Sequence, residues 1–386
     1  MVRRIKILLM LEATVGGAYR HVLQLALFLP KTEFDVSVVL SPLRGYDCDS
    51  DAGMLEQNGA RCLFIPMTRG ISLTGDMKAF MAIRRLLREQ HYDIVHTHSS
   101  KAGLLGRIAA YLHGAVRIVH TPHCFFFQGK KGVAKWFMKI PERLLARITD
   151  CIIAVSDSEK ALAEEERITA HDRIYIIKNA VLPGAVADED TKARLRKQYD
   201  IPEGKKVIAG VGRLTHQKDW ATFVHIAAEI VSRRNDVHFL IAGDGEERKR
   251  LETLIGKSGL QPYMTMAGYC RRMEEVYSIT DVLLHTSLWE GMPYALLEAM
   301  AYRIPVAATA VPGNADIISP GRNGYLFSIG RHMEGGRQVE ILLDDEQLRS
   351  KTGNAGYEYA VTHHSPEVFV RLHRQLYHRL AVIEEP

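Results

Sequence analysis

The sequence predicts an α/β protein built from two Rossmann-like domains, each with a parallel sheet covered by helices. Short apolar runs alternate with amphipathic helical stretches, which is typical of parallel strands joined by crossover helices. This alternation is interrupted once, between residues 182 and 205, and then restarts. A length of 386 residues also exceeds the size at which one core usually divides into two.

The first domain is expected over residues 1–182. The N-terminal basic pair leads into a short apolar run that contains Glu12 and reaches Gly16-Gly17, which indicates a buried strand rather than a signal peptide. Helices are expected over 76–90 and 100–113. The predicted strands are IKILLML (5–11), DVSVVL (35–40), CLFIP (62–66), DIVHTH (93–98), RIVHTP (117–122), CIIAVS (151–156) and IYIIKN (174–179).

The second domain is expected over residues 183–365, after a Pro- and Gly-containing linker with one short helix. Its predicted strands are KVIAGVG (206–212), VHFLIAG (237–243), YMTMAG (263–268), DVLLHTS (281–287), IPVAAT (304–309) and NGYLFS (323–328). Residues 366–386 predict a final helix that begins at Pro366 and returns to the first domain. Two facing domains of this type would create a deep cleft at the carboxyl ends of their strands.

Composition restricts the location and the partners. Five cysteines without a Cys-x-x-Cys pair suit a reducing compartment, and we expect the cytoplasm. No apolar run is long enough to predict a membrane-spanning helix. A net charge of +5 is too small to indicate nucleic acid, but the basic excess between Arg61 and Arg147 suits anionic lipid or a phosphorylated acceptor.

The stretch GVGRLTHQKDW places Arg213 and Lys218 between a strand and a helix. Glycines allow close backbone approach, a forked guanidinium and a compact ammonium suit a diphosphate, and a helix N-terminus favours anions. The alternative is a tight turn with two solvated cations. Together with the motif described next, the stretch favours phosphate binding.

Glu290 and Glu298 lie eight residues apart in WEGMPYALLEAM. A helical rise would separate their backbones by about 12 Å, whereas the two carboxylates of a glycoside hydrolase lie about 5–9.5 Å apart. The spacing therefore favours two carboxylates that bind different hydroxyls of one elongated ligand, such as a nucleotide sugar. The alternative is a first-turn acid that complements the helix dipole and a solvated helix residue.

The combination of these motifs resembles glycosyltransferase family 4, whose members are retaining enzymes of GT-B fold. The resemblance covers nearly the whole chain and includes AGDGEE (242–247), DVLLHTS (281–287) and EGMPYALLEAMA (290–301). In the first half, GGAYRHV, HTHSSKAGLLGRIAA and HTPH resemble the bacterial branch that assembles capsule, O-antigen and lipid-linked glycans.

The resemblance implies a role for each matching residue. Glu290 would contact the donor sugar, Glu298 the ribose, and Arg213 and Lys218 the diphosphate, while His123 would point at the sugar from the first domain. The implied catalytic residues are Glu290, His123, Arg213 and Lys218. The implied donor-binding residues are Gly16, Gly17, Arg213, Lys218, Gly243, Gly268, Tyr269, Glu290, Gly291, Met292, Pro293, Tyr294, Leu297 and Glu298.

Two residues depart from the family pattern. Cys124 stands where a glycine commonly follows the histidine, and Asp219 stands where a glycine commonly follows the lysine. These departures put the finer shape of the cleft in doubt, and leave the enzyme class unchanged.

The implied reaction moves a sugar from a nucleotide-diphosphate donor, with UDP expected, to a polyprenyl-diphosphate-linked saccharide at the inner face of the cytoplasmic membrane. The nucleotide sugar is a substrate, so no cofactor is expected. Negative charge develops on the departing diphosphate, and fixed cations would stabilise it in place of a metal. Retention follows from the resemblance, with the leaving phosphate helping to deprotonate the acceptor.

His96, His98, His120 and His123 also suggest a metal site. They fall at strand ends without a nearby carboxylate and lack the His-x3-His spacing of a helical metal site, so no metal is expected. For His123 a sugar contact is preferred over a satisfied loop histidine, largely from the resemblance.

Residues 125–148 combine a phenylalanine run with a basic amphipathic helix, a pattern that suits the bilayer interface near a lipid-linked acceptor. The alternative is a helix packed on the core with a solvated basic face, which Pro141 would break or restart. The membrane or acceptor candidates are Lys130, Lys131, Lys135, Trp136, Phe137 and Lys139.

Three other functions fit the sequence less well. A nucleotide-sugar epimerase of GT-B fold would need acid and base groups around the sugar, and the Glu-x7-Glu arrangement speaks against it. A non-catalytic sugar-nucleotide-binding subunit is disfavoured because all the implied catalytic residues are present. A dehydrogenase is disfavoured because Gly16-Gly17 does not extend to Gly-x-Gly-x-x-Gly. The donor sugar, the acceptor, the linkage and the oligomeric state are not determined by the sequence.

Overall fold

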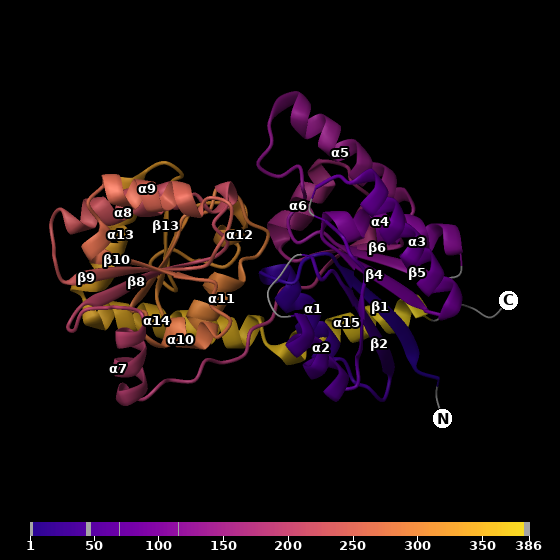
Figure 1. Cartoon of the computed structure of the whole chain (residues 1–386), viewed down its shortest axis with the longest axis horizontal. Coiled ribbons are helices and arrows are strands. Elements are labelled where there is room, and N and C mark those ends of the chain that lie inside the picture. Colours follow the sequence, from indigo (N-terminus) through magenta and orange to yellow (C-terminus); the bar gives the residue numbers. More distant parts are fainter. Residues whose placement is uncertain (1–2, 44–47, 69, 115, 382–386) are drawn as a thin grey trace. The chain divides into compact units, whose positions relative to one another are not determined.

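The computed structural model describes residues 3–43, 48–68, 70–114 and 116–381. The chain divides into two compact units, shown in Figure 1. The first unit comprises Met1–Ala180 with Pro366–Pro386, and the second comprises Val181–Ser365. The first unit is therefore built from two segments that are far apart in the sequence.

The first unit contains a seven-stranded parallel sheet with the strand order β3-β2-β1-β4-β5-β6-β7. Its register pairs Ile5 with Phe34 and Ile7 with Ile94. All seven predicted strands of this domain are present. They are β1 (Ile5–Leu11), β2 (Phe34–Leu40), β3 (Arg61–Phe64), β4 (Ile94–His98), β5 (Arg117–Thr121), β6 (Cys151–Ala154) and β7 (Ile174–Ile176).

Helices cover both faces of this sheet because its central strands are apolar on both sides. In β1, Ile7 and Leu9 share one core with α1, whereas Leu8 and Met10 share another with α3 and α4. The helices are α1 (Gly17–Phe28), α2 (Cys48–Gln57), α3 (Leu73–Glu89), α4 (Ser100–His113), α5 (Gly132–Arg147), α6 (Asp157–Glu165), η1 (His171–Arg173) and α15 (Pro366–Ala381).

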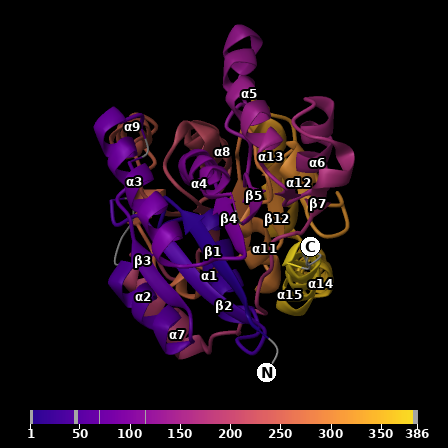
Figure 2. The same ribbon diagram turned by 90° about the vertical axis from the view of Figure 1, so that its right-hand side faces the viewer.

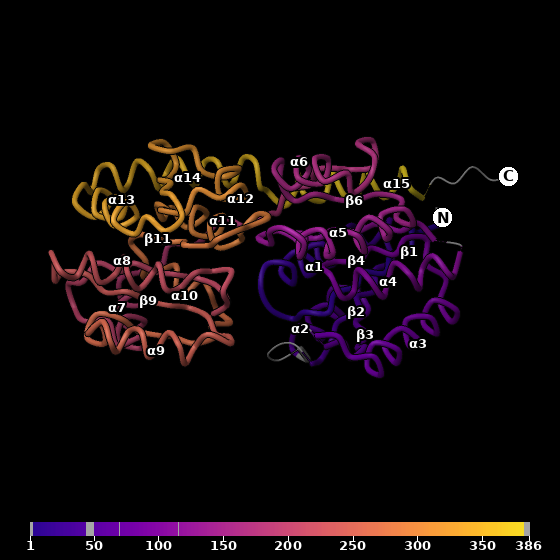
Figure 3. The backbone as a smooth tube through the Cα atoms, turned by 90° about the horizontal axis from the view of Figure 1, so that it is seen from above, coloured from indigo at the N-terminus to yellow at the C-terminus, as the bar shows by residue number. Residues whose placement is uncertain are grey.

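The last helix, α15, lies alongside the first unit, as Figure 3 shows. Phe369, Leu376 and Tyr377 are buried in the same core as α1. At the exposed edge of the helix, Arg374 Nε and His378 Nε2 each lie 2.7 Å from Glu33 Oε2. The apolar stripe of this segment is therefore buried against the first sheet and α1.

The second unit contains a six-stranded parallel sheet with the order β10-β9-β8-β11-β12-β13. All six predicted strands are present. They are β8 (Lys206–Val211), β9 (Val237–Ala242), β10 (Met264–Gly268), β11 (Val282–His285), β12 (Val306–Thr309) and β13 (Tyr325–Phe327).

On one face of this second sheet, α8 and α13 bury residues such as Phe223 and Leu342 against Ile208 and Leu284. The helices of the unit are α7 (Glu189–Gln198), η2 (His216–Lys218), α8 (Trp220–Val231), α9 (Arg248–Lys257), η3 (Gln261–Tyr263), α10 (Met273–Ser278), α11 (Tyr294–Ala301), α12 (Pro312–Ala315), α13 (His332–Asp344) and α14 (Glu346–His363).

Both sheets reverse their strand order at one point, between β1 and β4 in the first and between β8 and β11 in the second. Open α/β sheets bind ligands at the carboxyl ends of the strands that flank such a point. Each unit therefore has one predicted ligand edge. Among the described residues no helix is long and apolar enough to cross a membrane.

Candidate active site

At the ligand edge of the second sheet, two loops lie side by side. One follows β8 and contains Arg213 and Lys218, and the other follows β11 and contains Glu290. Backbone contacts join them: Leu288 N donates to Gln217 O at 2.8 Å, and the Gln217 side chain donates to Trp289 O at 2.9 Å. The fold thereby brings together two motifs that are far apart in the sequence.

The central contact between these loops is an ion pair. Lys218 Nζ donates to Glu290 Oε1, and the two side chains are only 17% and 8% exposed. The same carboxylate oxygen lies 2.6 Å from Ser287 Oγ, which donates to it, and 3.1 Å from His285 Nε2. His285 and Ser287 were not predicted as partners from the sequence, although both fall within the DVLLHTS stretch.

These contacts determine the charge state of the carboxyl group. Burial alone would raise the pKa of Glu290, but the Lys218 ammonium and the His285 hydrogen bond outweigh burial and hold that pKa well below its usual range. Burial and the nearby Lys218 lower the pKa of His285. The site therefore holds a carboxylate next to a neutral imidazole at neutral pH.

Glycines make this close packing possible. A Cβ atom on Gly243 would lie 1.8 Å from Gly212 O, so the loop after β9 touches the loop after β8 backbone to backbone. The stem of Lys218 lies over Gly212, with Cε 3.2 Å from the position of a Cβ. Gly243 N also donates to Gly268 O at 2.7 Å. Any side chain at Gly243 would displace the phosphate-binding loop predicted from the sequence.

Three other predicted residues of the second unit, Arg213, Gly268 and Tyr269, lie at the carboxyl ends of its strands. Arg213 follows Gly212, and its carbonyl accepts a hydrogen bond from Trp220 Nε1 at 2.9 Å. Gly268 ends β10, and Tyr269 follows it with 41% of its surface exposed. The structure thus places Arg213 in the same loop as Lys218. Tyr269 lies at the surface, directly after β10.

Helix α11 carries the second glutamate. It is preceded by Gly291, Met292 and Pro293, and Glu298 is its fifth residue. Glu298 Oε2 accepts a hydrogen bond at 2.7 Å from Tyr277 Oη, a residue of α10 that the sequence analysis missed. Glu290 and Glu298 therefore sit in two separate sets of hydrogen bonds.

Burial separates the other residues predicted on this helix. Met292 and Tyr294 retain 5% and 6% exposure, whereas Leu297 is completely buried. Because Leu297 is completely buried, it can only support the site by packing. Met292 and Tyr294, at the start of the helix, are better placed for direct ligand contact.

The ligand edge of the first sheet begins with Gly16 and Gly17. Gly16 adopts a positive φ of 82° as the N-cap of α1, and a Cβ at Gly16 would meet no atom within 4 Å. The requirement for glycine here is conformational, because L-residues rarely adopt this backbone geometry. Space beside the start of α1 is open, which fits the predicted close approach of a ligand to the backbone.

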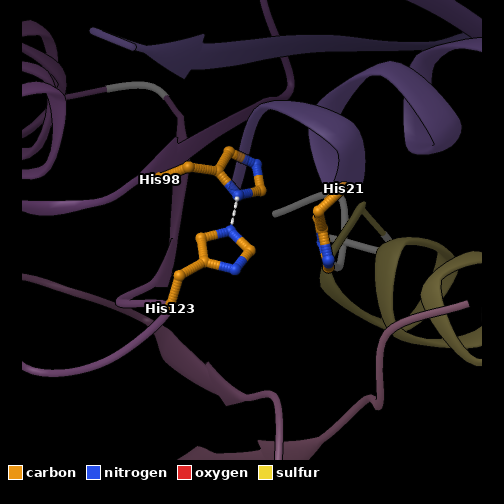
Figure 4. Close-up of side chains that lie close together, drawn as sticks. All are labelled: His21, His98 and His123. Atoms are coloured by element: carbon orange, nitrogen blue, oxygen red, sulfur yellow. Dashed lines mark hydrogen bonds between the residues drawn. The ribbon is translucent and has the colours of Figure 1, made fainter. Parts of the chain in front are cut away.

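His123 is half-buried and lies beside the buried rings of His21 and His98, as Figure 4 shows. Its Nε2 atom is 3.0 Å from His98 Nδ1, and its ring centroid is 4.6 Å from that of His21. His21 Nδ1 in turn lies 2.9 Å from Asn179 Oδ1. His21 and Asn179 are contacts that the sequence analysis missed.

The other predicted histidines are divided between the two faces of the sheet. His96 stacks near His98, with ring centroids 4.0 Å apart, and bonds to Tyr377 Oη at 2.7 Å. His120 bonds instead to Thr97 Oγ1 at 2.9 Å and packs against Gly103 of α4. His120 therefore does not belong to the cluster around His123.

Burial keeps these rings neutral. It lowers the pKa of His21 to about 4 and places the pKa values of His98 and His123 well below their usual range. Neutral imidazole is also the form that binds metal ions. Within the described part of the chain, one nitrogen from each of His21, His98 and His123 forms the group that could hold an ion, all within 4.8 Å of one another. The prediction of no metal therefore requires a direct test.

Two family models match the chain. Residues 15–183 match the model described as Glycosyltransferase Family 4, and residues 191–359 match the model described as Glycosyl transferases group 1. The UDP-Gal:alpha-D-GlcNAc-diphosphoundecaprenol alpha-1,3-galactosyltransferase of Escherichia coli is 32% identical over 324 residues, which cover 82% of this chain and 81% of that relative. The chain belongs to glycosyltransferase family 4.

Two further comparisons agree with this assignment. The capsular polysaccharide biosynthesis glycosyltransferase CapM of Staphylococcus aureus is 25% identical to this glycosyltransferase, covering 85% of it and 86% of CapM. The crystal structure of Anabaena HepE, in complex with UDP and glucose, superposes with a TM-score of 0.81 at 18% identity, covering 97% of this chain and all of HepE. The predicted GT-B fold is confirmed.

The two departures of this glycosyltransferase from the family pattern have a common physical consequence. Cys124 and Asp219 both adopt a positive φ, 101° and 45°, which is the backbone region that favours glycine. Asp219 compensates as the N-cap of α8: its Oδ1 accepts a hydrogen bond from the backbone Thr222 N at 3.4 Å, and its Oδ2 accepts one from Thr222 Oγ1 at 2.6 Å. The cysteine therefore carries the clearer conformational cost.

The basic aromatic segment of this enzyme forms one helix, α5, which projects from the first unit in Figure 1 and Figure 2. It continues through Pro141, so the expected break at that residue is wrong. Lys135 and Lys139 are held at 2.5 Å by Glu166 rather than being solvated. Lys130 and Lys131 precede the helix and are exposed.

The apolar face of α5 is exposed instead of packed on the core. Val133, Trp136, Phe137 and Leu144 are 71%, 52%, 62% and 54% exposed, while Leu145 and Ala146 are the buried residues of the helix. The alternative of a core-packed helix with a solvated basic face does not describe this arrangement.

Proposed function

We propose that this glycosyltransferase moves a sugar from a nucleotide-diphosphate donor, with UDP as the expected nucleotide, to a polyprenyl-diphosphate-linked saccharide. The proposal includes retention of anomeric configuration and independence from metal ions. The observation that carries it is the Lys218–Glu290 pair at the switch point of the second sheet. Support for the donor and the acceptor comes from the UDP complex of HepE and from the name of the Escherichia coli relative.

The ion pair has a specific part in the proposed reaction. An incoming diphosphate competes for the Lys218 ammonium, and Glu290 is then free to accept hydrogen bonds from hydroxyls of the donor sugar. Both side chains are already positioned, so neither needs a large reorganisation when the donor binds. The pair thus holds a cation and a carboxylate ready for the two ends of the same ligand.

Cleavage of the bond between the sugar and the diphosphate then produces charges that the site can stabilise. As the anomeric carbon leaves the diphosphate oxygen, positive charge grows on the sugar and negative charge grows on the nucleotide. Lys218 and Arg213 stabilise the departing diphosphate, and Glu290 stays ionised beside the sugar because of its low pKa. The acceptor hydroxyl oxygen bonds to the anomeric carbon, and its proton passes to the leaving phosphate. The neutral imidazole of His123 contacts the sugar during this step.

The decisive experiment measures nucleotide release from UDP-, GDP- and dTDP-sugars, with and without a polyprenyl-diphosphate-linked saccharide. Release that requires one donor and the lipid acceptor, and that falls at least about 100-fold in Glu290→Ala, supports the proposal. Turnover without any acceptor sugar, or an inverted anomer by NMR of the product, contradicts it. A Glu246→Ala variant, in the adjacent AGDGEE loop, serves as the matched control.

Metal independence is tested on the same reaction. We expect full activity after dialysis against EDTA, and no metal in the purified enzyme by elemental analysis. Loss of activity that returns with one added metal, together with loss of that metal from His21→Ala, would show that the histidine cluster is a metal site and overturn this part of the proposal.

The proposed membrane setting rests on the exposed side chains of α5. We expect the protein to float with vesicles of anionic lipid and the double variant Trp136→Ser/Phe137→Ser to remain in solution. The control is Met77→Ser/Met81→Ser, which removes two exposed apolar side chains from α3. Equal flotation of both double variants and the parent protein would contradict a membrane role for α5.

A further inference from the structure

A cavity of about 440 Å³ opens in the first unit where α5 and α6 end. Four of its lining residues are arginines. Ile168 and Thr169 also line the cavity and lie between two of these arginines in the sequence. The arginines are Arg143, Arg147, Arg167 and Arg173. We infer that this cavity, the arginine pocket, binds the phosphate of an anionic phospholipid headgroup. The inference deepens the proposed function, because it depends on an enzyme that works at a membrane.

The position of the arginine pocket separates it from the predicted reaction site. Its residues precede β6 and β7, at the amino ends of these strands, whereas His123 follows the carboxyl end of β5. Because all strands of the sheet are parallel, the two places lie at opposite edges of the unit. None of the four arginines belongs to the predicted catalytic or donor-binding set.

Two of the guanidinium groups are fixed by neutral acceptors. Arg143 donates to Glu166 O from both Nε and Nη2, at 3.0 and 2.6 Å. Arg173 donates to Ala146 O at 3.0 Å and to Thr149 O. Backbone carbonyls orient these side chains without cancelling their charge. The pocket therefore presents positioned cations, the arrangement that favours bidentate phosphate binding.

Three carboxylates on the surrounding elements contact other cations. Glu166 binds Lys135 and Lys139, Glu142 binds Arg107, and Asp150 contacts Arg117. No acidic residue is among the described residues that line the cavity. Four like charges around one volume repel each other, and a bound anion would relieve that repulsion.

Arg167 supports the inference independently through its backbone. It follows the C-cap of α6 with a φ of 47°, at the position where helices usually end with glycine. An arginine is conformationally costly there, yet its side chain lines the cavity. A glycine at this position would relieve the backbone strain of the turn, but it would remove a positive charge that could bind an anion.

Helix α5 indicates which phosphate is bound. Val133, Phe137, Leu144 and Arg147 follow one another at intervals of four, seven and three residues, and so share one face of the helix. The apolar members of that face are exposed. A helix lying in the bilayer interface along this face would bring Arg147 and the mouth of the pocket to the level of the lipid phosphates.

The test compares binding of the full chain to vesicles of phosphatidylglycerol and of phosphatidylcholine. We expect Arg147→Gln/Arg167→Gln to weaken binding to phosphatidylglycerol about 30-fold, since each basic residue at an anionic surface contributes about fivefold. The control Arg85→Gln/Arg88→Gln removes two exposed arginines from α3 and should change binding less than threefold. Equal losses in both variants would reduce the effect to general charge and overturn a built pocket.

Arg167→Gly separates binding from folding. We expect its Tm to equal or exceed that of the parent protein, because the turn favours glycine, while its affinity for phosphatidylglycerol vesicles falls. Unchanged vesicle affinity in this variant contradicts the inference. Calorimetry with glycerol 1-phosphate supplies the other arm: binding of this soluble phosphate to the pocket without any effect of the variants on vesicles would overturn the lipid assignment.

Transferase activity keeps this inference distinct from the proposed reaction. With a donor and a short-chain acceptor in detergent, the pocket variants should turn over like the parent protein. If they do, and vesicle binding is lost, both proposals stand. If the parent protein shows no transfer but still loses vesicle affinity on Arg167→Gly, only the proposed reaction fails.

Discussion

The ammonium of Lys218 and the carboxylate of Glu290 form a largely buried ion pair between loops 72 residues apart in the chain. Each charge was taken out of water, and each is compensated chiefly by the other. Removing one partner leaves an uncompensated charge, which usually costs more than replacing both. The pair therefore connects the stability of the second unit to the chemistry proposed for it.

A double-mutant cycle on this pair measures that connection. Lys218→Met and Glu290→Gln should each lower the free energy of unfolding by about 3 kcal/mol, and the double variant should lose clearly less than the sum. Denaturant unfolding followed by Trp220 and Trp289 fluorescence, in a Trp136→Phe background, reports on the second unit. Strictly additive losses would show that the two side chains are not coupled.

The same pair predicts an acid dependence. Because the folded-state pKa of Glu290 lies below its unfolded value, the pair contributes its full stability above about pH 4.3, and the contribution declines as pH falls through the folded pKa. The stability difference between the parent protein and Glu290→Gln should therefore shrink between pH 5 and pH 3, roughly. A constant difference across this range would mean that Glu290 is not an ionised, paired carboxylate.

The histidine cluster predicts a second acid effect, in the first unit. Burial lowers the pKa of His21 to about 4 and that of His373 to about 3, so the unfolded chain binds protons at a higher pH than the folded chain. Stability should begin to fall as pH drops below about 6.5, by about 1.4 kcal/mol per pH unit for each such histidine. Replacing His21 with Gln should reduce this slope in denaturant unfolding measured as a function of pH, and an unchanged slope would contradict the burial effect.

Cys124 provides a test of backbone strain. Its φ of 101° lies in the region that favours glycine, so Cys124→Gly should be more stable than Cys124→Ala by about 1–2 kcal/mol. The alanine variant is the appropriate reference because both substitutions remove the thiol and differ only in the Cβ. Thermal unfolding of the two variants gives the comparison, and a more stable alanine variant would contradict the strain assigned to this residue.

Gly243 tests the close approach of the two loops. A methyl group there would meet Gly212 O, so Gly243→Ala should cost about 1–3 kcal/mol more than Gly204→Ala. Gly204 also has a positive φ, of 74°, but a Cβ there meets open space. The control thus isolates the steric part of the effect. Donor affinity, measured by calorimetry with a UDP-sugar, should fall only in the Gly243 variant, and equal stabilities would count against the backbone contact.

The thirteen strands in the described residues could be predicted because they are short apolar runs that alternate with helical stretches. The family resemblance assigned the predicted phosphate-binding stretch and Glu290 to one ligand, and both motifs follow strands, but the ion pair between Lys218 and Glu290 was not predicted. His285 and Ser287 were missed as partners because a contact across a sheet edge depends on side-chain direction, which periodicity does not reveal.

Pro141 shows where local rules are overridden. Proline removes one helical hydrogen bond and favours a break, but α5 is also held by the Arg107–Glu142 pair, with Arg107 completely buried and two contacts at 2.7 and 3.1 Å. Tertiary anchoring of this kind cannot be seen in a local sequence window. The same limit hid His21, which approaches His123 from α1, and His373 of α15, whose ring centroid lies 5.6 Å from that of His21.

The division of the first unit between residues 1–180 and the helix that begins at Pro366 has a consequence for biosynthesis. A ribosome releases the residues of the first sheet long before it makes α15. Until then, the part of the sheet and α1 that contacts Phe369, Leu376 and Tyr377 stays exposed. The second unit, whose residues are contiguous, can fold during that interval. The nascent first unit is thus the stage at which a chaperone or a protease would most readily recognise this chain.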